Sequence, residues 1–253
     1  MYEEDLYGSW DSGHDSIHET IDELRNFDLK IIQPRRGYRF SVDPLLLCRF
    51  AGPAGGEIVD LGTGCGVIAL VMARIAPGAR VVGVESRMES AQLAERNVSL
   101  NGLARQVAII CADILDCKGR FPVSSFDLVL ANPPFRRKGT GKISPHAGRD
   151  TARHESTAGL ADFLAAAKFL VKPTGRICLV YHVSRLAELF TAASTLKLSP
   201  LRLQFVHGGP DDGARMVMME LGKGRSRELS VLPPFFVASN KMDQVSHEAV
   251  EQS

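Results

Sequence analysis

A glycine-rich turn between a strand-like run and a helical pattern restricts the possible folds more than any other feature of this sequence. Glu57–Leu61 is short and mostly apolar, as a buried strand is. Glycines follow at every second position, at Gly62, Gly64 and Gly66, and residues 67–75 then have the apolar spacing of a buried helix. Such glycines let the backbone pass close to a ligand at the end of the strand. The segment is therefore predicted to be a strand–turn–helix unit with a ligand site at the turn.

Short apolar runs and helical patterns keep alternating after this unit, which predicts a mainly parallel sheet with helices on both faces. Further strands are predicted at 80–85, 107–111, 127–131, 176–181, 201–206 and 215–221. Further helices are predicted at 88–100, 160–171 and 185–193. Because a turn-rich stretch separates the last two runs, we expect them to close the sheet as an antiparallel hairpin.

The length of 253 residues suits one α/β domain, residues 32–236, with an acidic N-terminal extension (1–31) and a polar, disordered C-terminal tail (237–253). Residues 1–24 contain eight acids and no Lys or Arg, unlike a secretory signal. No apolar run approaches the roughly 18 residues that span a bilayer, so we expect a cytoplasmic protein without a membrane partner. The five cysteines are scattered and the seven histidines have no ligand spacing, which predicts reduced thiols and no metal.

The glycine turn favours S-adenosylmethionine over a dinucleotide as the ligand. Dinucleotide sites use GxGxxG, whereas the spacing here is GxGxG and Val67 occupies the position of the third glycine. Asp60, just before the turn, would repel a pyrophosphate but attract a sulfonium and an amino group. Glu85 ends the next strand, where a carboxylate can accept hydrogen bonds from both hydroxyls of a ribose. Asp113 and Ile114 follow the third strand, where they would contact the adenine, although Asp113 has the alternative role of a helix N-cap.

Asn132-Pro133-Pro134-Phe135 directly follows the fourth strand and is the second specific motif. An exocyclic amine or amide nitrogen is a poor nucleophile because its lone pair is delocalised. The Asn132 side-chain oxygen and the Pro133 carbonyl would accept hydrogen bonds from its two N–H groups, and the prolines would hold these acceptors in place. Phe135 would stack on the flipped, planar substrate. A cytosine-C5 methyltransferase would need a cysteine nucleophile, which the motif lacks, and the remaining alternative is a simple Pro-Pro turn.

Together, the two motifs resemble the class I amino-methyltransferases that carry an NPPY or NPPF signature. Three further stretches are similar to the bacterial tRNA adenine-N6 methyltransferases that modify the adenosine beside the anticodon of a valine tRNA. They are Gln33 to Asp43, the Gly-Lys-Ile-Ser segment after Phe135, and Ala152-Arg-His-Glu155. The similarity extends from Ile32 to Pro234. It implies an α/β fold with a Rossmann-like, doubly wound seven-stranded sheet, mostly parallel with an antiparallel last strand.

The resemblance also implies which residues form the site. It places Gln33, Tyr38 and Phe40 over the cofactor and target pocket, although Tyr38 and Phe40 fit the core of the domain equally well. The predicted cofactor contacts are Gln33, Tyr38, Asp60, Gly62, Thr63, Gly64, Cys65, Gly66, Glu85, Ser86, Asp113, Ile114 and Asn132. The predicted catalytic residues are Asn132, Pro133, Pro134 and Phe135. The predicted substrate contacts are Phe40, Phe135, Arg136, Arg137, Lys138, Lys142 and Arg153.

Six cations and one acid lie between residues 136 and 153, so this segment is predicted to bind tRNA phosphates, with the anticodon loop as the target. A loop base is already partly unstacked, which lowers the cost of extruding it. The resemblance thus implies methyl transfer to the exocyclic amine of an adenine in tRNA. We expect the protein to be a monomer or a weak dimer. The alternatives are a ribosomal RNA guanine-N2 methyltransferase, a protein glutamine N-methyltransferase, and a non-catalytic RNA-binding module of the same fold.

Overall fold

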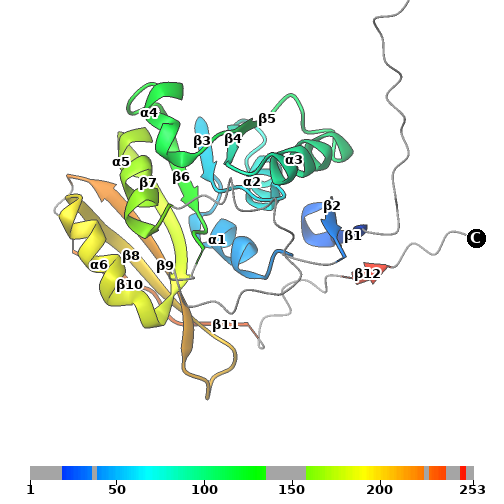
Figure 1. Ribbon diagram of the computed structural model, residues 1–253. Coiled ribbons are helices and arrows are strands. Elements are labelled where there is room, and N and C mark those ends of the chain that lie inside the picture. Colours follow the sequence, from blue (N-terminus) through cyan, green and yellow to red (C-terminus); the bar gives the residue numbers. More distant parts are fainter. Residues whose placement is uncertain (1–18, 36–38, 135–157, 225–227, 238–245, 249–253) are drawn as a thin grey trace, which may run out of the picture.

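The computed structural model describes residues 19–35, 39–134, 158–224, 228–237 and 246–248. Within them, seven strands form the body of a central sheet in the order β8-β9-β7-β6-β3-β4-β5 (Figure 1). These strands are β3 (Glu57–Leu61), β4 (Arg80–Glu85), β5 (Val107–Cys111), β6 (Phe126–Ala131), β7 (Val171–His182), β8 (Leu198–His207) and β9 (Ala214–Lys223). β9 is antiparallel to both of its neighbours and the other pairs are parallel. The predicted doubly wound sheet with an antiparallel last strand is therefore confirmed.

The strands bury both of their faces, because successive side chains along a strand point to opposite sides. On β6, Leu128 and Leu130 join one hydrophobic cluster, whereas Val129 and Ala131 join the other. Helices α1 (Asp43–Ala51), α2 (Val67–Ile75) and α3 (Met88–Leu100) pack on the first side. Helices α4 (Cys117–Arg120), α5 (Leu160–Leu170) and α6 (Leu186–Thr195) cover the second (Figure 1).

The structure differs from the predicted elements at α1, at the short helix α4, which was not predicted, and at the start of β7. Helix α1 was not predicted from the apolar periodicity; Pro44 lies in its first turn, a position where a proline ring fits a helix well. The Lys172–Gly175 stretch, which lies between the predicted helix at 160–171 and the predicted strand at 176–181, forms an irregularity inside β7, which begins at Val171. Gly175 is required there because a Cβ would lie 2.8 Å from the Asp127 carbonyl oxygen.

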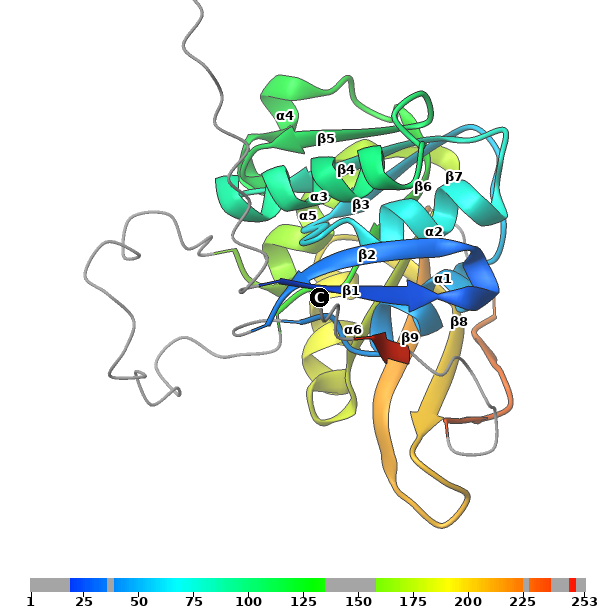
Figure 2. The same cartoon turned by 90° about the vertical axis from the view of Figure 1, so that its right-hand side faces the viewer.

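Outside the central sheet, β1 (Glu19–Leu24) and β2 (Leu29–Pro34) form an antiparallel hairpin joined by the 3₁₀ turn η1 (Arg25–Phe27). The hairpin lies beside α2 and α3 (Figure 2). Its Leu24, Leu29 and Ile31 are buried in the same cluster as α1 and α2. The domain boundary expected between residues 31 and 32 thus falls inside β2, since these apolar side chains attach the hairpin to the domain.

Three short strands complete the described fold. β10 (Ser230–Val231) and β11 (Phe235–Phe236) pair with β8 at the edge of the sheet. β12 (Ser246–Glu248), which lies in the C-terminal stretch expected to be disordered, pairs with β1. None of the helices in the described ranges combines the length and apolarity that a membrane span requires.

Candidate active site

The turn between β3 and α2 is held in a conformation that its glycines make possible. Gly62, Gly64 and Gly66 have φ values of +75°, +57° and +87°, in the left-handed region that side chains disfavour. The Gly62 and Thr63 N–H groups donate to the Val84 carbonyl of β4, at 2.8 and 3.0 Å. The alternation of glycines in the sequence therefore reflects three left-handed residues in one turn.

The three glycines differ in the space around them. A Cβ on Gly66 would lie 3.2 Å from the Ala94 Cβ of α3, and one on Gly62 would lie 3.3 Å from the Phe163 ring of α5. A Cβ on Gly64 would meet no described atom within 4 Å. The turn is therefore packed on both flanks and open at Gly64, as a cradle for a ligand has to be.

Glu85 connects the end of β4 to this turn. The residue is 8% exposed, and its Oε2 accepts a hydrogen bond from the Gly64 N–H at 3.0 Å. Its Oε1 accepts from the Arg87 N–H at 3.0 Å, and the Ser86 hydroxyl lies 3.5 Å from the same oxygen. The carboxylate is therefore oriented at the carboxyl end of the sheet, beside the open face of the turn.

Asp60, the fourth residue of β3, is fully buried and incompletely paired. Its Oδ2 accepts a hydrogen bond from the Thr63 hydroxyl at 2.5 Å, whereas its Oδ1 has no partner among the described residues. Burial disfavours the charged form and, with a smaller effect of the nearby Glu85, raises the pKa of Asp60 to about 7. A cationic group at this end of the sheet would supply the missing partner.

Asp113 and Ile114, the predicted adenine contacts, follow β5, and Asp113 makes a hydrogen bond within the protein. The Asp113 Oδ1 accepts a hydrogen bond from the Leu115 N–H at 3.0 Å, which makes Asp113 the N-cap of the short 3₁₀ turn η2 (Ile114–Asp116). Ile114 is 4% exposed. The N-cap role that the sequence left open is therefore present, and contact with an adenine stays a prediction.

The second motif leaves the sheet beside the glycine turn. Leu61 of β3 is paired in register with Ala131 of β6, so Gly62 and Asn132 are the first residues beyond the same pair. The Asn132 Oδ1 is buried and has no hydrogen-bond partner in the described part of the chain. Pro133 is buried and Pro134 is exposed. The fold thus brings an unsatisfied amide oxygen to the same edge of the sheet as Glu85.

The structure gives Gln33 and Phe40 roles in the hairpin region. The buried Gln33 amide donates to Asp22 and accepts from the Phe40 N–H at 2.9 Å. Phe40 packs against the hydrophobic cluster of α1 and α2, which was its alternative interpretation. The remaining predicted contacts lie outside the described residues: Tyr38, Phe135, Arg136, Arg137, Lys138, Lys142 and Arg153.

Two residues next to the turn were not predicted. Phe163 covers Gly62, and the buried Asn97 of α3 donates a hydrogen bond to the Cys65 carbonyl at 2.9 Å. Cys65 itself contributes this carbonyl rather than a nucleophile, since burial raises the pKa of its thiol to about 11. Asn97 had a signal in the sequence: it lies three residues after Ala94, on the apolar face of the helix.

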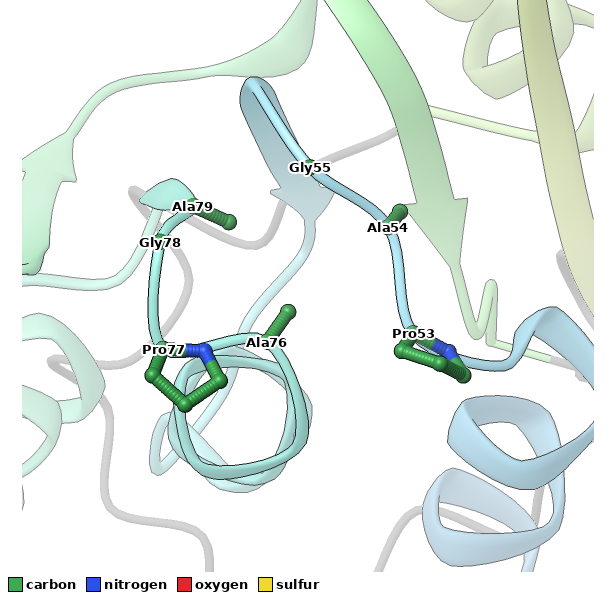
Figure 3. A pocket seen from close by; sticks show the side chains of 7 residues that line it. All are labelled: Pro53, Ala54, Gly55, Ala76, Pro77, Gly78 and Ala79. Carbon is green, nitrogen blue, oxygen red and sulfur yellow. The ribbon is translucent and has the colours of Figure 1, made fainter.

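A separate hollow lies at the opposite edge of the sheet, before β3 and β4 begin (Figure 3). Its lining consists of Pro53, Ala54, Gly55, Ala76, Pro77, Gly78 and Ala79. These small residues offer no titratable or hydrogen-bonding side chain. The candidate site is therefore the carboxyl edge, where Asp60, Glu85 and Asn132 meet.

Comparison with known proteins identifies the family of this chain. The model of the family described as methyltransferase small domain matches residues 42–189, which include both motifs. The tRNA1(Val) (adenine(37)-N6)-methyltransferase of Porphyromonas gingivalis is 33% identical over 207 residues, 79% of this chain and 80% of the relative. A protein of the same name from Trichodesmium erythraeum is 29% identical over 208 residues, 79% of this chain and 84% of the relative.

Solved structures share the fold. A predicted O-methyltransferase from Agrobacterium tumefaciens superimposes with a TM-score of 0.62 and 22% identity, over 77% of this chain and 86% of that one. TrmN from Thermus thermophilus superimposes with a TM-score of 0.51 and 23% identity, over 71% of this chain and 48% of that one. With the family match covering more than half of its length, the chain belongs to the methyltransferase small domain family.

Proposed function

We propose that this chain transfers a methyl group from S-adenosylmethionine to the N6 amine of an adenine in tRNA. The observation that carries the proposal is the pair of buried oxygens at one edge of the sheet, Asp60 Oδ1 and Asn132 Oδ1. Neither has a hydrogen-bond partner among the described residues, and a buried acceptor without a partner is costly. A donor molecule with a cationic end and a substrate with an amine would satisfy one oxygen each.

The residues around the glycine turn fit S-adenosylmethionine. Asp60 would attract its positive charge, the open space at Gly64 would admit its body, and the oriented Glu85 carboxylate would accept from its ribose hydroxyls. Ser86, Asp113 and Ile114 follow the ends of β4 and β5 and would be further contacts. When bound, this cofactor supplies an electrophilic methyl group on a sulfonium.

Asn132 and Pro133 would prepare the acceptor nitrogen. Two acceptors, the Asn132 Oδ1 and the Pro133 carbonyl oxygen, would take hydrogen bonds from the two N–H groups of an exocyclic amine. This holds the nitrogen in place and favours a tetrahedral geometry in which its lone pair is available. The position of Asn132 directly beside Gly62 in the strand register supports this role. Stacking by Phe135 stays a prediction from the motif.

Adenine in tRNA is the substrate best supported by similarity and charge. The relatives from Porphyromonas gingivalis and Trichodesmium erythraeum are both named for adenine methylation in a valine tRNA. The six cations between Arg136 and Arg153, which lie outside the described residues, follow the acceptor motif directly in the sequence. A cationic segment there would bind phosphates near the target base. We therefore propose a base of the anticodon loop, where extrusion costs least.

A labelling experiment tests the proposal. The protein is incubated with methyl-labelled S-adenosylmethionine and, separately, with total tRNA, ribosomal RNA or cell protein, and the products are digested. We expect label in N6-methyladenosine from tRNA, and its formation should be about 10²- to 10³-fold slower with the Asn132→Ala variant. Label in N2-methylguanosine or in methylglutamine would show that the substrate is a guanine in RNA or a protein glutamine instead of an adenine in tRNA. Absence of label in all three, together with no heat of binding for the cofactor, would point to a non-catalytic RNA-binding module.

A further inference from the structure

On the edge away from β1, the backbone of β2 pairs with two side-chain amides, that of Asn97 in α3 and that of Asn101, the C-cap of α3. The Ile32 N–H donates to the Asn97 Oδ1 at 2.7 Å, and the Asn97 Nδ2 donates back to the Ile32 carbonyl at 3.1 Å. Asn101 makes the same pair of bonds with Lys30, at 2.8 and 2.7 Å. Four residues along a helix and two residues along a strand both advance about 6–7 Å. The spacing of the two asparagines therefore matches the spacing of Lys30 and Ile32 on β2.

Asn97 and Asn101 differ in their third hydrogen bond. The Asn97 Nδ2 also donates to the Cys65 carbonyl of the glycine turn at 2.9 Å. The Asn101 Nδ2 instead donates within its own helix, to the Asn97 carbonyl at 2.7 Å. Asn97 is fully buried. One side chain therefore joins the N-terminal hairpin to the glycine turn, and a similar side chain one helical turn away does not.

Three consecutive residues of the turn, Gly64, Cys65 and Gly66, each contact a neighbouring strand or helix. The Gly64 N–H is held by Glu85, the Cys65 carbonyl by Asn97, and Gly66 rests on Ala94 of the same helix. A backbone with three left-handed glycines has many alternative conformations, and each attachment reduces the entropy that ligand binding would otherwise have to remove.

We propose that Asn97 is a positioning residue that makes the β1–β2 hairpin part of the cofactor site. This inference rests on the proposed binding of S-adenosylmethionine at the glycine turn. Asn97 is not one of the predicted cofactor or substrate contacts; through its hydrogen bond to the Cys65 carbonyl it would set the position of the Gly64–Gly66 backbone. Because coupling between two sites is reciprocal, a ligand that orders the turn also steadies the hairpin.

The matched pair of asparagines provides the first test. Asn97→Ser and Asn101→Ser are compared for binding of S-adenosylhomocysteine by calorimetry, at a temperature where thermal unfolding shows both variants folded. We expect Asn97→Ser to weaken binding about tenfold, as the loss of a buried hydrogen bond to the turn would. Asn101→Ser should stay within about twofold of the unmodified protein, because its bonds do not reach the turn. Equal affinity in all three proteins would overturn the inference.

Hydrogen exchange on the unmodified protein provides a second test that does not depend on the folding of a variant. Adding S-adenosylhomocysteine should slow exchange at the turn amides, Gly64 to Gly66, and at the hairpin amides of β1 and β2. Slower exchange at the turn alone would overturn the role of Asn97 and leave the proposed function in place. No slowing anywhere, with no heat of binding, would overturn the proposed function and this inference with it.

Discussion

The Oε2 atom of Glu85 lies 3.0 Å from the Gly64 nitrogen and accepts its N–H, which joins the end of β4 to the turn that follows β3. Since Oε1 accepts from the Arg87 N–H, the carboxylate is oriented from two sides before any ligand arrives. Such preorganisation lowers the entropy cost of binding. A single side chain thus both shapes the turn and presents acceptors to the proposed ribose.

Replacing Glu85 should therefore weaken cofactor binding. Hydrogen bonds to charged groups contribute about 1.5–3 kcal/mol, so Glu85→Ala should raise the dissociation constant of S-adenosylmethionine about 10- to 100-fold. Glu89→Ala is the control, because the Glu89 side chain is 85% exposed and pairs only loosely with Arg87, at 3.5 Å. Calorimetry on both variants measures the difference. Similar affinities for the two would show that the carboxylate of Glu85 does not hold the ribose.

Gly64 and Gly102 have similar left-handed backbone conformations, so comparing them separates two effects of a Gly→Ala change: steric exclusion of the cofactor and strain in the backbone. Gly64 and Gly102 both have left-handed φ values, +57° and +66°, and a Cβ on either meets no described atom within 4 Å. Each Gly→Ala change should cost about 1–2 kcal/mol of unfolding free energy from backbone strain alone. Only Gly64→Ala places a methyl group in the proposed cofactor space, so only it should abolish measurable S-adenosylmethionine binding.

Urea unfolding and calorimetry on the Gly64→Ala and Gly102→Ala variants provide the measurements. Equal losses of stability with a loss of binding confined to Gly64→Ala would place the cofactor against the turn. If the Gly64→Ala variant bound S-adenosylmethionine as tightly as the Gly102→Ala variant, the cofactor would not lie against the turn.

The sequence was sufficient for the strands around the site because their signals are local. Glu57–Leu61, Arg80–Glu85 and Val107–Cys111 occur with the predicted bounds, since each is a mainly apolar run with a glycine or a polar residue within two positions of its end. The attachment of the β1–β2 hairpin was not predictable in this way. Its first strand, β1, carries three acids and so lacks the apolar pattern of a core strand, and the hairpin is fixed by long-range contacts such as that between Arg96 and Glu19, at 2.6 Å.

In the candidate site, too, the residues of short motifs could be predicted, whereas the residues that reach the site through long-range packing could not. The turn glycines and Asn132 belong to short motifs, so their residue types identify them directly. Asn97 and Phe163 act on the turn from helices that are distant in the sequence, and only the packing of α3 and α5 brings them there. Periodicity can assign them to a buried face but cannot say which backbone group they contact.

Asp60 should make stability depend on pH in an unusual direction for a carboxylate. Its pKa is raised from 3.8 to about 7 in the folded protein, mainly by burial, so the folded state holds its proton more tightly than the unfolded chain. The stabilisation is complete below about pH 4 and is lost as the pH rises through 7. Between pH 5 and 7, the free energy of unfolding should fall by on the order of 1 kcal/mol per pH unit from this group.

Urea unfolding of the unmodified protein and of Asp60→Asn at pH 5, 6, 7 and 8 isolates this contribution, because other titrating groups are common to both. The difference in unfolding free energy between the two proteins should change steadily from pH 5 to 7 and level off near pH 8. A constant difference across the series would mean that Asp60 keeps an ordinary pKa despite its burial.

Asn132 should show opposite effects on stability and activity. Its buried Oδ1 has no partner in the described part of the chain, and an unsatisfied buried acceptor costs about 1–3 kcal/mol, so Asn132→Ala should not lower the midpoint of thermal unfolding. Its role in holding the acceptor amine predicts a loss of about 10²- to 10³-fold in the methylation rate, comparable to removing one preorganised group from an active site. Affinity for S-adenosylmethionine should change by only a few-fold, because the turn and Glu85 remain intact. Single-turnover methylation of tRNA with saturating cofactor, calorimetry and thermal unfolding together check all three expectations. A loss of cofactor affinity as large as the loss of rate would instead assign Asn132 to the cofactor, and lowered stability would show that its oxygen already has a partner in the folded protein.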